Sequence, residues 1–127
     1  MARIELPSTQ ADGTPHWVEY RDKLKAGDRF AVQAVAKVEL GSGNTDKRTA
    51  SFLEMQNDMR NALLGRIITE WSFPDPIPSQ NSFAAADVVI GNVMDLEDYA
   101  ALEKAVEPLM DLIAGRNTPD PKTLSGS

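Results

Sequence analysis

The sequence predicts a mainly α-helical protein, in which a small N-terminal β-hairpin precedes a bundle of three or four helices. Two observations support this fold class. Apolar residues recur every three or four positions over long stretches, and two short alternating segments flank an Asp12-Gly13 turn signal. Because 127 residues suit one domain with a moderate core, we expect a single domain at residues 1–115 and a polar C-terminal tail at residues 116–127.

The hairpin is expected at about residues 2–21. Ile4 and Leu6 alternate with charged side chains in the first segment. In the second segment, HWVEYR, the alternation places Val18 and Tyr20 on one face. An isolated hairpin is only marginally stable in water, so this one must pack against the helices.

Four helices are expected, and their approximate bounds are 26–40, 48–72, 82–91 and 96–114. In the first, Phe30, Ala34 and Val38 lie on one apolar face. Asp28 is in the first turn of this helix, where the helix dipole favours a carboxylate. The segment GSGNTDK at 41–47 then predicts a flexible break before the second helix.

The helix expected at 48–72 has the strongest apolar repeat in the chain. Its stripe comprises Phe52, Met55, Met59, Leu63, Ile67 and Trp71. Thr49 is the expected N-cap. Gly65 costs about 1 kcal/mol relative to alanine and would allow the close approach of another helix. Three prolines at positions 74–78 prevent the helix from continuing.

The last helix, expected at 96–114, should start after Asp95 as its N-cap and stop at Gly115. Its apolar stripe comprises Tyr99, Leu102, Val106, Leu109 and Ile113. Pro108 lies inside this helix and is expected to kink it or to divide it in two.

The composition excludes several classes of function. Thirteen basic and nineteen acidic residues give a net charge of −6, which argues against non-specific binding to nucleic acid or to an anionic membrane. The absence of cysteine removes disulfides and thiolate metal sites. The N-terminus lacks the apolar run of a signal peptide, and no stretch approaches the roughly 20 apolar residues that span a bilayer. We therefore expect a soluble intracellular protein with no nucleic acid or membrane partner.

No residue pattern predicts catalysis. His16 is the only histidine, and no serine lies in a nucleophile-elbow context, so an ordinary turn histidine is the simpler explanation. One histidine without cysteine does not suffice for a zinc site. The acidic residues Asp95, Glu97 and Asp98 are better explained by helix capping than by a divalent cation site. We predict a non-enzymatic protein with no catalytic residue, no cofactor and no metal.

Several large apolar side chains are candidates for contact with a partner. Methionine repacks easily, so Met55 and Met59 would suit an adaptable binding surface, although filling the core is the simpler role. Trp71 and Phe73 are expected to close the core at the helix end. There they would pack against the last helix, beside Tyr99. The candidate partner-binding residues are Met55, Met59, Trp71, Phe73 and Tyr99.

Three segments carry a resemblance to a known family, namely WVEYRD at Trp17–Asp22, the run Leu64–Pro78 and the run Leu96–Met110. In their order and in their short motifs, these segments resemble the small tail assembly chaperones of long-tailed, siphovirus-type bacteriophages that infect actinobacteria. The resemblance implies a non-enzymatic protein that coats the helical tape measure protein, keeps it soluble and helps to recruit tail tube protein. It also implies several copies per client, or a homo-oligomer, in the host cell cytoplasm.

Two other interpretations remain open. A structural virion component, such as a head-to-tail connector or a tail accessory protein, would oligomerise into a ring and stay in the mature particle. A small adaptor or antitoxin-like regulator would also suit an acidic helical protein.

Overall fold

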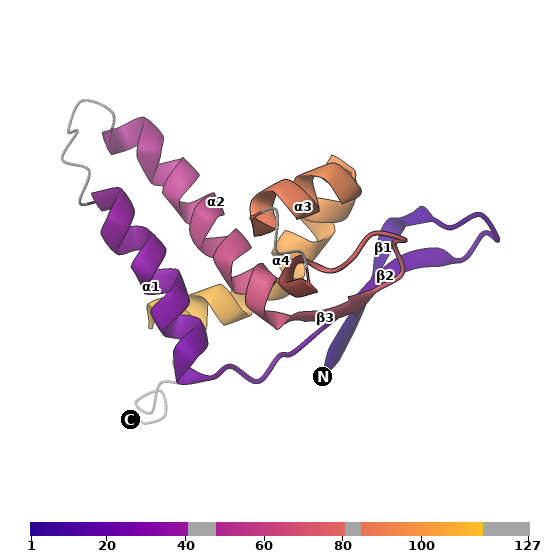
Figure 1. Cartoon of the computed structure of the whole chain (residues 1–127), viewed down its shortest axis with the longest axis horizontal. Helices are drawn as coiled ribbons and strands as arrows, with labels where there is room; N and C mark the ends of the chain where they lie inside the picture. The colour runs from indigo at the N-terminus through magenta and orange to yellow at the C-terminus, as the bar shows by residue number, and fades with distance from the viewer. Residues whose placement is uncertain (41–47, 81–84, 116–127) are drawn as a thin grey trace, which may run out of the picture.

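A computed structural model describes residues 1–40, 48–80 and 85–115 of the chain (Figure 1). Over these residues the protein forms four α-helices, one short 3-10 helix and a three-stranded antiparallel sheet in the order β1-β2-β3. The fold is therefore mixed α/β and rich in helix. It contains the predicted N-terminal hairpin, together with a strand that the mainly α-helical prediction did not include.

Strands β1 (Ala2–Thr9) and β2 (Pro15–Tyr20) form the hairpin, as the alternating pattern predicted. Gly13 in the turn has a φ of 89°, a left-handed conformation that glycine adopts without steric cost. Leu6 and Val18 face the core and are almost fully buried. The hairpin therefore packs against the rest of the fold, as its marginal stability in isolation requires.

The prediction was wrong at the end of the long helix, which was expected at 48–72. Helix α2 spans Arg48–Ile67, and Ile68–Trp71 forms strand β3 instead of a last helical turn. β3 pairs antiparallel with β2, and Trp71 lies opposite Val18. Its β-branched and aromatic residues suit a strand, and the open edge of β2 offers backbone hydrogen bonds that a helical turn would forgo. The prolines therefore follow a strand rather than a helix.

Helix α1 (Ala26–Leu40) has the predicted bounds but not the predicted buried face. Phe30 is 65% exposed and Ala34 is exposed, whereas Asp28 and Val32 are fully buried. Asp28 and Val32 are four residues apart and share a face of the helix, and Phe30 lies on the opposite face. Asp28 binds two arginines at this position, and these ion pairs explain which face of α1 turns inward.

The helices do not form a simple bundle. Helices α1 and α2 lie side by side, α3 (Ala86–Val93) packs on α2, and α4 (Leu96–Ala114) packs on β1 (Figure 1). A 3-10 helix, η2 (Pro78–Gln80), follows the proline-rich segment. The α2–α3 contact depends on Gly65, because a Cβ there would lie 2.8 Å from the Cβ of Ala86. The expectation that Gly65 allows another helix to approach is confirmed.

Helix α4 starts after Asp95 and stops at Gly115, as predicted, and Gly115 has the left-handed φ of 79° that is typical of this cap. The Asp95 side chain, however, makes no capping hydrogen bond. The helix continues through Pro108, which does not divide it. Asp98 attaches α4 to the sheet, because its carboxylate accepts hydrogen bonds from the Ser8 backbone N–H at 3.0 Å and from the Ser8 hydroxyl at 2.6 Å.

One hydrophobic core unites the sheet and the helices. Its buried side chains come from β1, β2, β3 and all four described α-helices, and they include Val18, Val32, Leu63, Ile90 and Leu102. Burial of each such aliphatic side chain contributes about 1.5–3 kcal/mol relative to exposure.

Some predictions lie outside the described residues. These are the break at 41–47, residues 82–84 of the helix expected at 82–91, the tail at 116–127, and the side chains of Val38, Thr49 and Phe52. The described part of that helix differs from the prediction, because Ala85 is extended and α3 runs from Ala86 to Val93. Within the described ranges, no helix combines the length and the apolar character that crossing a bilayer requires.

Candidate protein-binding face

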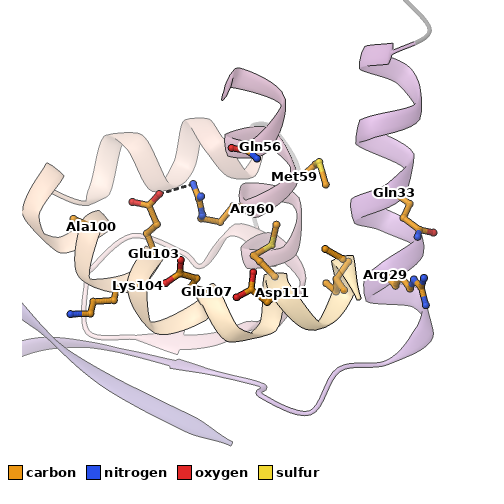
Figure 2. A pocket seen from close by; sticks show the side chains of 13 residues that line it. Arg29, Gln33, Gln56, Met59, Arg60, Ala100, Glu103, Lys104, Glu107 and Asp111 are labelled. Atoms are coloured by element: carbon orange, nitrogen blue, oxygen red, sulfur yellow. Dashed lines mark ion pairs between the residues drawn. The ribbon is translucent and has the colours of Figure 1, made fainter. Parts of the chain in front are cut away.

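Two adjoining hollows lie among the helices. The first hollow has a volume of about 620 Å³ and is lined by thirteen residues of α1, α2 and α4 (Figure 2). Met59 of α2 and Met110 of α4 contribute apolar side chains to its lining. Charged side chains of both signs, Arg29, Lys104 and Glu107, lie around them. The first hollow is therefore amphipathic.

The second hollow has a volume of about 510 Å³ and is lined by residues of α2, α3 and the first turns of α4. Ile90 and Met94 are buried side chains of its lining, and Leu96 is 81% exposed. Tyr99 also lines this hollow, and its hydroxyl donates a hydrogen bond to Asn61 Oδ1 at 2.7 Å. That bond fixes the half-buried tyrosine ring between α4 and α2.

An ion pair joins the two hollows. Arg60 Nη1 of α2 lies 2.9 Å from Glu103 Oε2 of α4, and Glu103 lines both hollows (Figure 2). Arg60 also donates a hydrogen bond to Asn57 Oδ1 at 2.8 Å. The Glu103 side chain is 41% exposed, so water screens the pair and its contribution to stability is about 1 kcal/mol at most. Its main effect is to hold α2 and α4 together between the hollows.

The five predicted partner-binding residues divide between three places. Met59 lines the first hollow and Tyr99 lines the second. Met55 is buried, as the simpler core-filling interpretation expected. Trp71 and Phe73 belong to strand β3 and to the turn that follows it. The structure thus brings Met59 and Tyr99 to one face, and it gives Trp71 and Phe73 a separate environment.

Trp71 and Phe73 find their partners near the sheet. Trp71 is buried, and its indole N–H donates a hydrogen bond to the Asp75 carbonyl at 2.7 Å. The Phe73 ring meets Trp71 edge-on at 5.5 Å between centroids and stacks on His16 at 4.3 Å. Trp71 is part of the hydrophobic core, as expected. It lies in strand β3, because α2 ends at Ile67, earlier than predicted.

The structure places a serine beside the only histidine. His16 Nδ1 lies 2.8 Å from Ser72 Oγ, and the same hydroxyl accepts a hydrogen bond from the Trp17 backbone N–H at 2.9 Å. These bonds tie β2 to the residue that follows β3. Sequence reasoning missed this pair because it depends on the β2–β3 register.

Asp28 is a fully buried carboxylate where β2, α1 and α2 meet. Arg21 donates to both of its oxygens, at 2.8 and 3.0 Å, and Arg66 Nε donates at 2.8 Å. The Lys25 backbone N–H donates at 2.8 Å. The hydrogen bonds from Arg21 lower the pKa of Asp28 well below its usual range, although burial acts in the opposite direction, and Lys25 and Arg66 add to the effect. From the sequence, the only role expected for Asp28 was a favourable interaction with the helix dipole.

The acidic residues that the sequence grouped at the start of α4 have different surroundings. Asp98 is buried against Ser8, whereas Asp95 and Glu97 are exposed. In the part of the chain that the structure describes, no group of three or more histidine, cysteine, aspartate or glutamate side chains is placed to hold a metal ion.

Comparison with known proteins identifies no relative: no family model matches the chain, and no similar protein is found among curated proteins or solved structures.

Proposed function

We propose that this protein is a tail assembly chaperone of a long-tailed bacteriophage and acts without catalysis in the host cell cytoplasm. Its client is the tape measure protein, and tail tube protein is a second partner. Several copies coat each client, or assemble as a homo-oligomer around it. The resemblance of Trp17–Asp22, Leu64–Pro78 and Leu96–Met110 supports the assignment.

The observation that carries the proposal is the pair of adjoining hollows between helices. A chaperone for a long helical client needs apolar grooves that accept amphipathic helices. Met59 and Met110 in the first hollow and Met94 in the second can repack around different client segments. The net charge of −6 keeps a crowded complex of many copies soluble.

Co-expression with a candidate tape measure protein tests the proposal. We expect the client to be insoluble alone and soluble with the chaperone, with many copies per client by size exclusion and light scattering. Failure to bind the client, together with closure into a ring of fixed size, would support a connector or tail accessory protein instead. Mass spectrometry of purified particles separates these cases, because a chaperone is absent from the particle and a structural component is present.

A pair of variants on α4 sharpens the test. Met110→Glu places a charge in the first hollow and should reduce the amount of client that co-purifies. Leu112→Glu changes an exposed side chain of the same helix that lines neither hollow, so it should leave co-purification unchanged. Equal co-purification by both variants would contradict a role for the first hollow.

A further inference from the structure

The second hollow contains a glycine that packing among the described residues does not require. Gly91 lies inside α3, where glycine is less favourable than alanine. The other glycine of this region, Gly65, has a structural reason, since a Cβ there would lie 2.8 Å from the Ala86 Cβ. A Cβ at Gly91 would meet no atom of residues 1–40, 48–80 and 85–115 within 4 Å, and Gly91 lines the second hollow. The space above Gly91 therefore leaves room for a group from another molecule.

Exposed apolar surface borders the same space. Leu96 is 81% exposed, the highest value among the large apolar side chains of the described residues. It lines the hollow together with Ile90 and Met94, whose side chains are buried. An apolar floor with an exposed leucine at its edge is typical of a site that receives an apolar side chain of a partner.

The chain around the second hollow is strongly acidic. Between Arg66 and Lys104 the sequence contains seven of its nineteen acidic residues and none of its thirteen basic residues. The nine described residues that line the hollow include two acidic side chains, Asp87 and Glu103, and no basic one; Arg60, outside the lining, pairs with Glu103 and leaves Asp87 as the acid that faces a partner. Asp87 is one of the two, and Glu97 is exposed directly after Leu96. A complementary partner must therefore combine apolar and basic side chains.

From these observations we propose that the second hollow binds a basic amphipathic helix of a partner protein. An apolar side chain of that helix enters the space above Gly91 and packs on Ile90 and Met94, and its neighbours cover Leu96. Lysine or arginine side chains beside the apolar stripe face Asp87 and the other carboxylates. This inference rests on the proposed function, because it names the kind of client segment that the chaperone holds.

The acidic residues around the second hollow also disfavour binding of a second copy of this chain there. A two-fold symmetric contact places the same surface of both copies face to face. Here it would bring two acidic segments together, and like charges oppose such an association.

Titration of two designed peptides into the full chain tests the proposal. Both peptides have about 18 residues, enough for a helix to form, and share one leucine face. The polar face is lysine in one and glutamate in the other. We expect the lysine peptide to bind at least about tenfold more tightly at low salt, to weaken as salt is added, and to shift the amide resonances of α3 and of the start of α4. Equal binding of both peptides, or shifts centred on the first hollow, would overturn the proposal.

Two variants and a control locate the site. Gly91→Leu places a large side chain in the space where a Cβ would meet no atom of the described residues within 4 Å, and it should weaken binding of the lysine peptide by about tenfold or more. Leu96→Ala removes an exposed side chain and should weaken it by a smaller factor. Leu112→Glu, outside both hollows, should leave it within about twofold of wild type. Circular dichroism verifies that each variant is folded, and a folded Gly91→Leu variant that binds like wild type would overturn the proposal.

The peptide titration and the co-expression experiment can fail independently. If the chain solubilises the tape measure protein but Gly91→Leu has no effect on either ligand, the hollow is not the site and the proposed function stands. If the second hollow binds the lysine peptide but the chain does not bind the tape measure protein, the binding site is supported and the proposed function is wrong.

Discussion

The junction around Asp28 and the second hollow around Gly91 each contain a glycine and a carboxylate, but these residues have different surroundings in the two regions. At the junction, a Cβ on Gly27 would lie 2.9 Å from Arg66 Nη2, so this glycine lets the arginine approach the buried carboxylate. At the second hollow, the space beside Gly91 is open, and the neighbouring carboxylate of Asp87 is exposed. Glycine and acid serve contacts within the chain in the first region and face solvent in the second.

This difference separates residues that the fold requires from residues that are available to a partner. Every buried side-chain nitrogen or oxygen of the described residues has a hydrogen-bond partner. Loss of such a partner is costly, because a buried polar group without a hydrogen bond has lost its water as well. Substitutions at the junction should therefore reduce stability strongly, and substitutions at the second hollow should change it by about 1 kcal/mol or less.

The largest effect is expected at the centre of the junction. Asp28→Ala leaves Arg21 and Arg66 without their carboxylate, and we expect the free energy of unfolding to fall by about 3 kcal/mol. Urea denaturation measures the change. The matched control is Asp87→Ala, an exposed acid in the first turn of α3, which should cost about 0.5 kcal/mol. Similar losses in the free energy of unfolding for both variants would show that the two regions do not differ in this way.

A smaller loss is expected where α4 joins the sheet. Ser8→Ala removes the hydroxyl that donates to Asp98 at 2.6 Å but keeps the backbone hydrogen bond. We expect a loss of about 2 kcal/mol in the free energy of unfolding, because the buried carboxylate loses one donor. Ser79→Ala, an exposed serine in η2, should change stability by less than about 0.5 kcal/mol. A neutral Ser8→Ala variant would show that this hydrogen bond does not anchor α4.

Replacement of glycine by alanine should change the free energy of unfolding in opposite directions at Gly65 and at Gly91. Gly65→Ala forces α2 and α3 apart, and this strain exceeds the gain in helix propensity, so we expect a net loss of about 1 kcal/mol. In Gly91→Ala the new Cβ meets no atom of the described part of the chain within 4 Å, so the substitution should stabilise the fold by about 0.5–1 kcal/mol. Thermal and urea denaturation of both variants give the sign directly. A destabilised Gly91→Ala variant would mean that the fold itself needs this glycine.

Mild acid should weaken the junction by the smallest amount. The pKa of Asp28 is lowered from its ordinary value of 3.8, chiefly by hydrogen bonds from Arg21. A depressed folded pKa contributes stability above the unfolded pKa, and this contribution is lost as the pH falls below that value. Between about pH 5 and about pH 3.5, wild type should lose up to about 1 kcal/mol more than Asp28→Asn. Urea midpoints of both proteins across this range measure the difference, and parallel pH profiles would contradict it.

Part of the candidate face was visible in the sequence. Met59 and Tyr99 were among the predicted partner-binding residues, because an apolar helical repeat identifies the side chains near the core and its edges. Gly91 and Leu96 were not, because neither residue type signals a binding site by itself. Their significance depends on the open space between α3 and α4, which exists only in the folded chain.

Local patterns by themselves determined the hairpin, the helix at 26–40 and the helix at 96–114 with its stop at Gly115. Such features depend on periodicity and turn chemistry within a few residues, so the sequence contains the necessary information.

Only the tertiary structure decided the remaining features. The segment Ile68–Trp71 became a strand because the edge of β2 offered it hydrogen bonds. Helix α1 turned Val32 inward because Arg21 and the distant Arg66 held Asp28 in the core. Arg66 is 38 residues from Asp28, and the Ser8–Asp98 contact spans 90 residues. Interactions over such separations form only when the whole chain packs, so no local pattern contains them.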